Sequence, residues 1–185
     1  MIDLYYLDES GFAPTLPAGY SWAREGTRAV VPYEAPQGRR VNVIGALAPF
    51  GPAPRLVYES RTGKLDSAAF LRFLWQDVAG LPAVPDLLPS GYVRARPCVV
   101  VLDNYSVHRS KLVQAVQPAL AAAGVRFYYL PPYSPEFNAI EPLWRHLKYE
   151  DMPIRSHTTA EALKAAVDDA LDNHAAALQR PTTNL

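Results

Sequence analysis

Two short apolar runs, each followed at once by an aspartate, constrain the fold of this chain more than any other feature. The first runs from Ile2 to Leu7 and leads to Asp8, and the second, 98–102, leads to Asp103. An apolar run of five to six residues is typical of a strand buried on both faces of a sheet. Open α/β folds place their chemistry at the carboxyl ends of such strands. If the two strands are neighbours, Asp8 and Asp103 lie together there, and paired carboxylates suit a hard divalent cation.

The rest of the pattern predicts a mixed α/β domain. Further strands are expected at 20–24, 29–33, 41–49, 55–60 and 125–130. Four helices are expected: one from the cap Asp66 to Gly80, one over 111–123 with a kink at Pro118, one carrying Ile140, Leu143, Trp144 and Leu147, and one starting at a capping box of Thr158 and Glu161. This order predicts a mixed sheet with helices packed on its faces. We expect a single domain over residues 1–178, with 179–185 as a frayed tail.

Composition excludes several classes of protein. At 185 residues, with 49% hydrophobic and 19% charged residues, the chain has the make-up of a globular domain rather than a disordered one. It has no apolar run of membrane-spanning length and no signal-peptide pattern at its start. Cys98 is the only cysteine and is expected in the core, which excludes an intrachain disulfide or a cysteine-rich zinc cluster. A cytoplasmic location is expected.

The charge is balanced overall but uneven along the chain. A net charge of zero counts against a dedicated nucleic-acid-binding module. Residues 20–72, however, contain eight basic and four acidic side chains. A basic face of this kind can hold phosphates, although ordinary surface charge is an equal alternative. The candidates for phosphate contact are Arg24, Arg28, Arg39 and Arg40.

A third acid, Glu141, ends the stretch 130–141, Leu-Pro-Pro-Tyr-Ser-Pro-Glu-Phe-Asn-Ala-Ile-Glu. It follows Ile140 at the edge of a helical apolar stripe, so it can face the sheet edge that carries the two aspartates. A structural alternative is that Asn138 caps this helix and Glu141 bonds back to the cap backbone. Asp8 and Asp103 also have such an alternative, because single aspartates at strand ends often stabilise turns.

Two of these segments, 102–108 (Leu-Asp-Asn-Tyr-Ser-Val-His) and 130–144, resemble the mariner-type bacterial insertion-sequence transposases. That family belongs to the DDE superfamily, whose RNase-H-like fold is shared with retroviral integrases. Residues 7–12, Trp22, Gly26 and the strand at 40–47 are also similar to the family pattern, and the resemblance spans about residues 2–151. The 130–141 stretch is its most specific part. The resemblance implies an RNase-H-like α/β fold, a five-stranded mixed sheet flanked by helices.

The resemblance also implies that Asp8, Asp103 and Glu141 are catalytic and bind metal. The expected cofactor is Mg²⁺, with Mn²⁺ as a substitute, and two ions, with Asp8 bridging them, Asp103 holding one and Glu141 the other. Two such ions can activate an attacking oxygen and neutralise the leaving oxygen of a phosphodiester. The implied activity is cleavage at transposon ends, followed by attack of the freed 3′-hydroxyl on target DNA.

Four further residues in the two segments are candidates for auxiliary roles. Asn104 and His108 are placed to position a metal-bound water or a phosphate, although His108 could equally cap the following helix. Tyr133 and Ser134 are candidate DNA contacts, and the rigidity of their proline-rich loop is an alternative reason for them. The three tryptophans are expected mostly in the core.

The expected partners are double-stranded DNA, both transposon inverted-repeat ends and target, and a second copy of the chain. The family normally carries helix-turn-helix modules before the catalytic domain, whereas this sequence starts on the first catalytic strand, so a separate N-terminal DNA-binding polypeptide is a possible partner. Such a protein would associate with the nucleoid when acting. Between Asp103 and Glu141 lie 37 residues, a few more than the family usually has, and Ala139 replaces a common proline. Two alternatives stay open: a non-catalytic remnant that binds nucleic acid or dimerises, and a general nuclease of the same fold.

Overall fold

The computed structural model describes residues 1–14, 23–28, 30, 40–51, 53–152 and 157–180. Most of the two strands expected at 20–24 and 29–33 lies outside these residues, and the described Ala23, Arg24 and Val30 belong to no strand. Trp22, Arg39 and most of the expected tail also lie outside. No described helix is long and apolar enough to cross a membrane.

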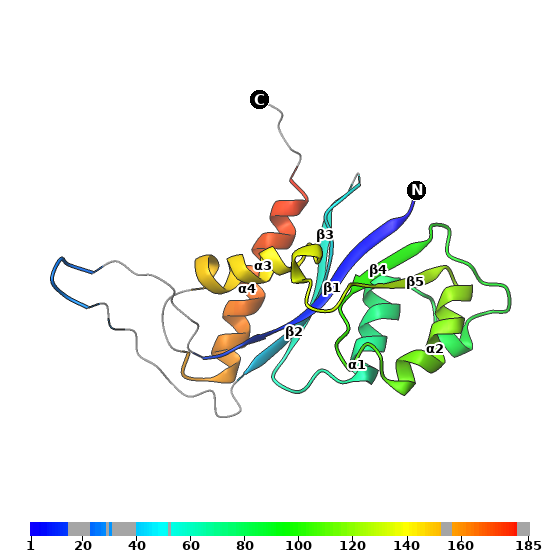
Figure 1. Cartoon of the computed structure of the whole chain (residues 1–185), viewed down its shortest axis with the longest axis horizontal. Coiled ribbons are helices and arrows are strands. Elements are labelled where there is room, and N and C mark those ends of the chain that lie inside the picture. The colour runs from blue at the N-terminus through cyan, green and yellow to red at the C-terminus, as the bar shows by residue number, and fades with distance from the viewer. Residues whose placement is uncertain (15–22, 29, 31–39, 52, 153–156, 181–185) are drawn as a thin grey trace.

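In the described residues five strands form one mixed sheet, as the resemblance implied (Figure 1). They are β1 (Asp3–Phe12), β2 (Val41–Ala48), β3 (Arg55–Arg61), β4 (Cys98–Leu102) and β5 (Val125–Tyr129). Their order in the sheet is β3-β2-β1-β4-β5. The first three strands are antiparallel neighbours, whereas β1, β4 and β5 run parallel. The N-terminal strand is therefore the central one, between the antiparallel and the parallel part.

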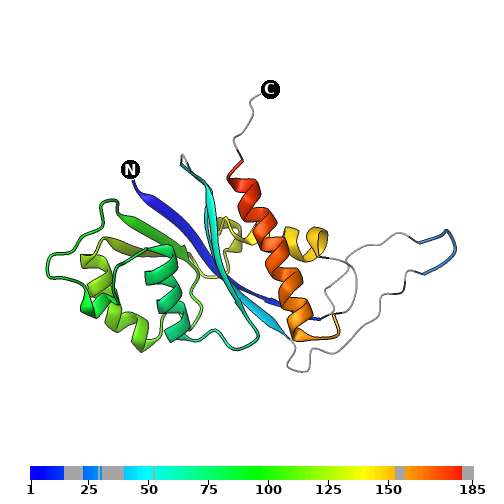
Figure 2. The same ribbon diagram turned by 180° about the vertical axis from the view of Figure 1, so that it is seen from behind.

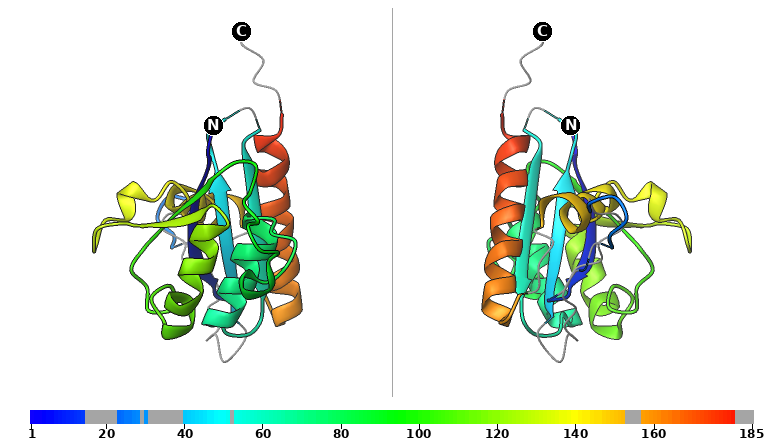
Figure 3. Two further views of the ribbon diagram at one scale, coloured as in Figure 1. Left: turned by 90° about the vertical axis from the view of Figure 1, so that its right-hand side faces the viewer. Right: turned by 90° about the vertical axis from the view of Figure 1, so that its left-hand side faces the viewer.

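Helices cover both faces of the sheet. On one face lie α1 (Ser67–Arg72), its π-helical continuation Phe73–Val78, and α2 (Lys111–Ala122). The other face packs against α3 (Glu141–His146), its π-helical continuation Leu147–Asp151, and α4 (Ala160–Leu178). Figure 2 shows α4 beside β2 and β3, with α1 and α2 toward β4 and β5, and Figure 3 shows α4 running along the sheet. Short 3₁₀ turns occupy Pro85–Leu87 and Pro135–Phe137.

Three helices of the described segments begin at a side-chain cap. Asp66 accepts a hydrogen bond from the Ala69 backbone N–H, as predicted for α1. Ser110, and not His108, caps α2. The capping box predicted at the start of α4 was wrong by one residue, because the hydroxyl of Thr159 takes the cap position. The helix α2 continues through Pro118.

The strand β1 is longer than its apolar run. We expected the strand to end at Asp8 and a loop containing Gly11 and Pro14 to follow, but this was wrong: the strand continues to Phe12. The reason is that β2 pairs along this whole segment, with Asp8 opposite Gly45, and satisfies its backbone groups. On its other edge β1 pairs with β4 only as far as Tyr6. Asp8 therefore sits on a strand that is held from one side and open on the other.

Candidate active site

The three acids come from three different elements around the end of β4. Parallel pairing of β1 and β4 sets Asp3 opposite Cys98, and the same register continued past the last pair brings Asp8 level with Asp103. A hollow of about 570 Å³ is lined by Asp8 and Asp103, among others. A second hollow of about 420 Å³ is lined by Asp103 and Glu141, the first residue of α3. Asp103 belongs to both hollows, so the structure brings the three predicted acids to one place.

Charge accumulates at this place. Burial raises the pKa of Asp8 to about 7, and the charges of Glu141, Glu9 and Asp103 add to the rise, in that order. Burial also raises the pKa of Glu141, with a further contribution from Asp103. Desolvation and like charge both disfavour ionised carboxylates. The site therefore carries an excess of negative charge that a cation would relieve.

We expect Asp8→Asn to stabilise the metal-free protein by about 4 kcal/mol near pH 8. In the folded state the pKa of Asp8 is about 7, whereas an ordinary aspartate, as in the unfolded chain, has a pKa of 3.8. The free energy of unfolding of the native chain should thus fall as the pH rises from about 4 to about 7, and the variant should lack this fall. Urea denaturation in a chelator measures both. Equal stability of the two proteins near pH 8 would contradict the prediction, whereas near pH 4 they should converge.

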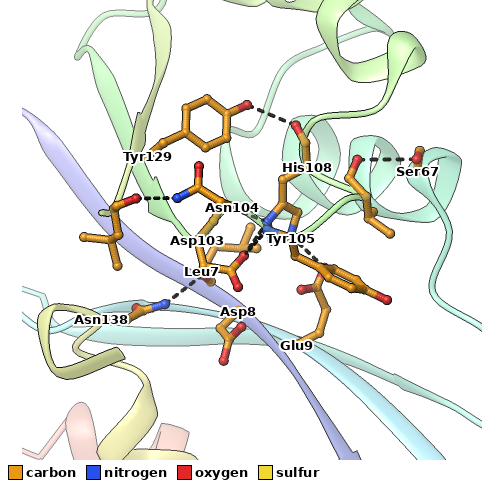
Figure 4. Close-up of polar contacts among 12 residues, drawn as sticks. Leu7, Asp8, Glu9, Ser67, Asp103, Asn104, Tyr105, His108, Tyr129 and Asn138 are labelled. Carbon is orange, nitrogen blue, oxygen red and sulfur yellow. Dashed lines mark hydrogen bonds and ion pairs between the residues drawn. The ribbon is translucent and has the colours of Figure 1, made fainter. Parts of the chain in front are cut away.

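Asp103 is held differently from Asp8. His108, which is fully buried, donates from Nδ1 to Asp103 Oδ1 (3.0 Å) and from Nε2 to Glu9 Oε1 (2.9 Å). The Tyr105 backbone N–H donates to the same Oδ1 at 2.9 Å. Figure 4 shows Asp103, His108 and Glu9 converging beside Asp8. Among the residues that the structure describes, no donor is recorded for Asp103 Oδ2, so one oxygen is fixed and the other remains for a ligand.

The bridge between the two carboxylates keeps His108 charged. Burial acts to lower the pKa of His108, but the hydrogen bonds and charges of Asp103 and Glu9 raise it to about 9. In return, the hydrogen bond from His108 lowers the pKa of Asp103 in spite of its partial burial. Asp103 is consequently ionised across the neutral range, whereas its neighbour Asp8 titrates near pH 7.

We expect His108→Ala to lower the free energy of unfolding by about 3 kcal/mol, since it leaves the Glu9 carboxylate, 15% exposed, without its counter-charge. It should also reduce any metal-dependent activity, because Asp103 loses its fixed orientation. Chemical denaturation of the purified variant measures the first effect. Glu9→Gln is the matched control: its amide oxygen still accepts from Nε2, and it should cost clearly less. A larger cost for Glu9→Gln than for His108→Ala would contradict this account.

The segment before Glu141 is hydrogen-bonded to β1, and its Asn138 side chain does not cap α3. Asn138, which is buried, donates from Nδ2 to the Leu7 carbonyl at 3.2 Å. The cap residue of α3 is Ile140, without a side-chain cap, so the capping box considered for Asn138 and Glu141 is absent from the structure. Trp144 Nε1 donates to Asp8 Oδ2 at 3.0 Å. Trp144 was expected mostly in the core and is buried there, but its contact with Asp8 could not be read from the apolar stripe.

Sequence reasoning also missed Lys148. Burial lowers its pKa, and the charges of Glu141 and Asp8 oppose the shift, which places its ammonium group within electrostatic reach of both acids. Lys148 follows Glu141 by seven residues, two helical turns, and this spacing was the signal available. Arg40 contributes to the same pKa shift, so it too lies near the site.

The other predicted contact residues divide into two groups. Tyr133 and Ser134 line the hollow that Asp103 and Glu141 share, and Tyr133 is fully exposed with a left-handed backbone (φ 58°). Asn104 lines it as well, and its amide donates to the Leu130 carbonyl at 2.5 Å, anchoring the loop after β4 to the end of β5. In contrast, Arg24 and Arg28 lie exposed around the turn at Gly26, without a recorded contact to the acids in the described part of the chain.

Comparison with known structures finds the same fold. A Mos1 strand transfer complex is 15% identical with a TM-score of 0.60, and covers 92% of this chain and 47% of its own. A Mos1 transposase paired-end complex with left transposon end is 15% identical with a TM-score of 0.63, and the match covers 92% of this chain and 48% of that one. A Mos1 mariner paired end complex with Mn is 13% identical with a TM-score of 0.62, and the match covers 96% of this chain and 50% of that one. The chain spans about half the length of these proteins, and a comparison with curated proteins found no match.

These matches confirm the expected RNase-H-like α/β fold. The family model of the DDE superfamily endonucleases matches residues 3–164, which include all three acids and the elements that carry them. That match extends over most of the chain, and this protein therefore belongs to the DDE superfamily endonucleases.

Proposed function

We propose that this chain is the catalytic domain of a DDE transposase, which cleaves DNA at transposon ends and joins the freed ends to target DNA. The observation that carries the proposal is the arrangement of Asp8, Asp103 and Glu141 around the end of β4. The structural matches support it, because they are complexes of a transposase captured with paired ends and after strand transfer.

The acids are suited to a hard divalent cation. All three offer oxygen ligands, and the raised pKa values of Asp8 and Glu141 mark a site with too little positive charge of its own. Mg²⁺, or Mn²⁺ as in one matched complex, is the expected ion. With two ions, Asp8 would contact both, Asp103 one and Glu141 the other. Bound ions of this kind activate an attacking oxygen and neutralise the leaving oxygen of a phosphodiester.

The remaining residues of the site position DNA and ligands. His108 and Glu9 fix one oxygen of Asp103 and leave the other directed to its ligand. Lys148 and Arg40 supply positive charge next to the acids, where a scissile phosphate has to lie. Tyr133 and Ser134, at the rim of the hollow shared by Asp103 and Glu141, are placed to contact the DNA beside it. Asn104 holds the loop after β4 in place.

The partners follow from the same proposal. The substrate is double-stranded DNA, and the protein is expected to act as a homodimer on paired ends. A separate N-terminal DNA-binding polypeptide is the expected partner for recognition of the end sequence.

A direct test incubates the purified protein, with Mg²⁺ or with chelator, with duplexes that carry the element's own inverted repeat and with unrelated duplexes. Metal-dependent nicking at the repeat boundary, followed by joining of its 3′ end to a target plasmid, is the expected result. Metal-dependent cutting of any duplex without joining would identify a general nuclease. DNA binding of equal affinity with and without metal, and no nicking in the presence of any end-binding partner, would identify a non-catalytic remnant.

A further inference from the structure

Two histidines and an aspartate meet where α3 and its π-helical continuation pack against α4. They are His146 on α3, Asp151 at the end of the continuation, and His174 on α4. The Asp151 carboxylate lies between the rings: Oδ1 is 3.4 Å from His146 Nε2, and Oδ2 is 2.6 Å from His174 Nε2. One ligand atom from each of the three residues lies within 4.8 Å of the other two. Residues distant in the sequence thus direct three potential ligand atoms to one point.

The two imidazole rings are held at an angle to each other, and one of them is held by a further carboxylate. The two imidazoles are nearly perpendicular (88°), with centroids 5.2 Å apart, so they do not stack. Glu150 Oε2 lies 2.9 Å from His146 Nδ1 and accepts its hydrogen, which turns Nε2 toward Asp151. Histidines that bind metals commonly donate their other ring nitrogen to a carboxylate in this way, which fixes the tautomer and the ring orientation. Glu150 holds that position here.

The kind of donor distinguishes this cluster from the three acids around β4. Two imidazole nitrogens and one carboxylate oxygen suit Zn²⁺ and its neighbours among the transition metals, whereas Mg²⁺ prefers oxygen ligands alone. Tetrahedral Zn²⁺ with bonds of about 2.0–2.1 Å separates its ligand atoms by about 3.4 Å. The distance from Asp151 Oδ1 to His146 Nε2 already has this value, and the three ligand atoms all lie within 4.8 Å of one another.

We propose that His146, Asp151 and His174 form a binding site for a transition-metal ion of the Zn²⁺ type. The side chains are 44%, 31% and 25% exposed, so an ion can enter from solvent. Asp151 and His174 also line a surface groove, together with Asp169 and Asn173. Three protein ligands would leave the fourth position of a tetrahedral ion to water.

Such an ion would link α3, the helix that begins at Glu141, to α4, which packs on the same face of the sheet. The helix α3 starts at Glu141 and ends at His146, and α4 carries His174. A metal bond between them would clamp the far end of α3 to α4. Binding should therefore raise the thermal stability of the protein, in addition to any effect on catalysis.

The test is a calorimetric titration of the metal-free protein with Zn²⁺ in excess Mg²⁺, which occupies the oxygen-rich site. One equivalent should bind, and the melting temperature should rise with it. His146→Ala, His174→Ala and Asp151→Asn should each weaken binding by about tenfold or more. Co²⁺ should give the intense visible absorption of a tetrahedral site in the native protein and lose it in these variants. Asn173→Ala, a neighbour in the same groove, is the matched control and should bind as the native chain does.

Three outcomes would overturn the proposal. In the first, Zn²⁺ does not raise the melting temperature of the native chain, and His174→Ala only lowers stability. The three side chains would then form ion pairs without binding a metal. Another is Zn²⁺ binding that survives in all three ligand variants. The third is binding that disappears in excess Mg²⁺ and is lost in Asp8→Asn, which places the ion at the acids instead. If one alanine variant fails to fold, Asp151→Asn, which preserves size and shape, decides the result.

Discussion

Conversion of Asp8 or Asp103 to Asn, or of Glu141 to Gln, is expected to lower metal-dependent DNA cleavage by at least about a thousandfold. Each change removes one carboxylate charge from the set that would hold the cations, and a loss of about 4 kcal/mol in transition-state stabilisation corresponds to that factor. The substitutions are close in size, so packing is retained. The measurement is the rate of strand nicking on end DNA in the assembled transposase.

A neighbouring acid provides the control. Glu136 is exposed in the 3₁₀ turn Pro135–Phe137, five residues before Glu141 in the same segment. Glu136→Gln removes the same charge from the same loop and should leave the cleavage rate within about twofold. Full activity in any one of the three acid variants would remove that residue from the proposed site.

Gly45→Ala is expected to have the second largest effect, although position 45 has no reactive group. Gly45 lies opposite Asp8 on β2, and a Cβ there would come within 2.7 Å of the Trp144 ring. Trp144 is 3% exposed and bonded to Asp8, so it cannot move freely. Ile140 lies on the same side, 3.1 Å from the added atom. The strain should cost about 1–3 kcal/mol of stability.

Gly45→Ala should also lower the cleavage rate, beyond what the loss of folded protein alone would explain. Displacement of Trp144 breaks its hydrogen bond to Asp8 and moves α3, which starts at Glu141, so two of the three acids lose their positions together. A decrease in nicking rate of tenfold or more is expected, because misplacement by about 1 Å can cost a hundredfold. Gly63→Ala, where an added Cβ meets nothing within 4 Å, is the control for both measurements. A native rate and stability in Gly45→Ala would show that Trp144 can repack.

The sequence predicted most of the fold because its apolar patterns were clear. The runs before Asp8 and Asp103 identified two strands, and the stripe through Trp144 identified the helix after them. The end of β1 was predicted wrongly because the segment after Asp8 is polar and is held by pairing with β2, a long-range interaction that local composition does not show. Thr158 and Thr159 are equivalent as caps in the sequence, and only the geometry of the chain distinguishes them.

The immediate surroundings of the acids were less predictable. The bond from Asn138 to Leu7 spans 131 residues, and the bond from Trp144 to Asp8 spans 136. No local rule pairs residues so distant. The role of Glu9 depends on the alternation of side chains along β1, which turns it away from Asp8 and toward His108. Spacing along a helix was the only sequence signal for Lys148, and it required knowing that Glu141 faces the site.

The central place of β1 has a consequence for how the protein acquires its site during synthesis. Its parallel partner β4 lies about 95 residues later in the chain, and the helix that carries Glu141 later still. A chain emerging from the ribosome can pair β1, β2 and β3 early, but contacts between residues so far apart form late. Glu141 is thus missing from every nascent fragment that stops before α3, even where β1 and β4 have already paired. The order of synthesis itself delays completion of the three-acid cluster until most of the domain is present to hold it.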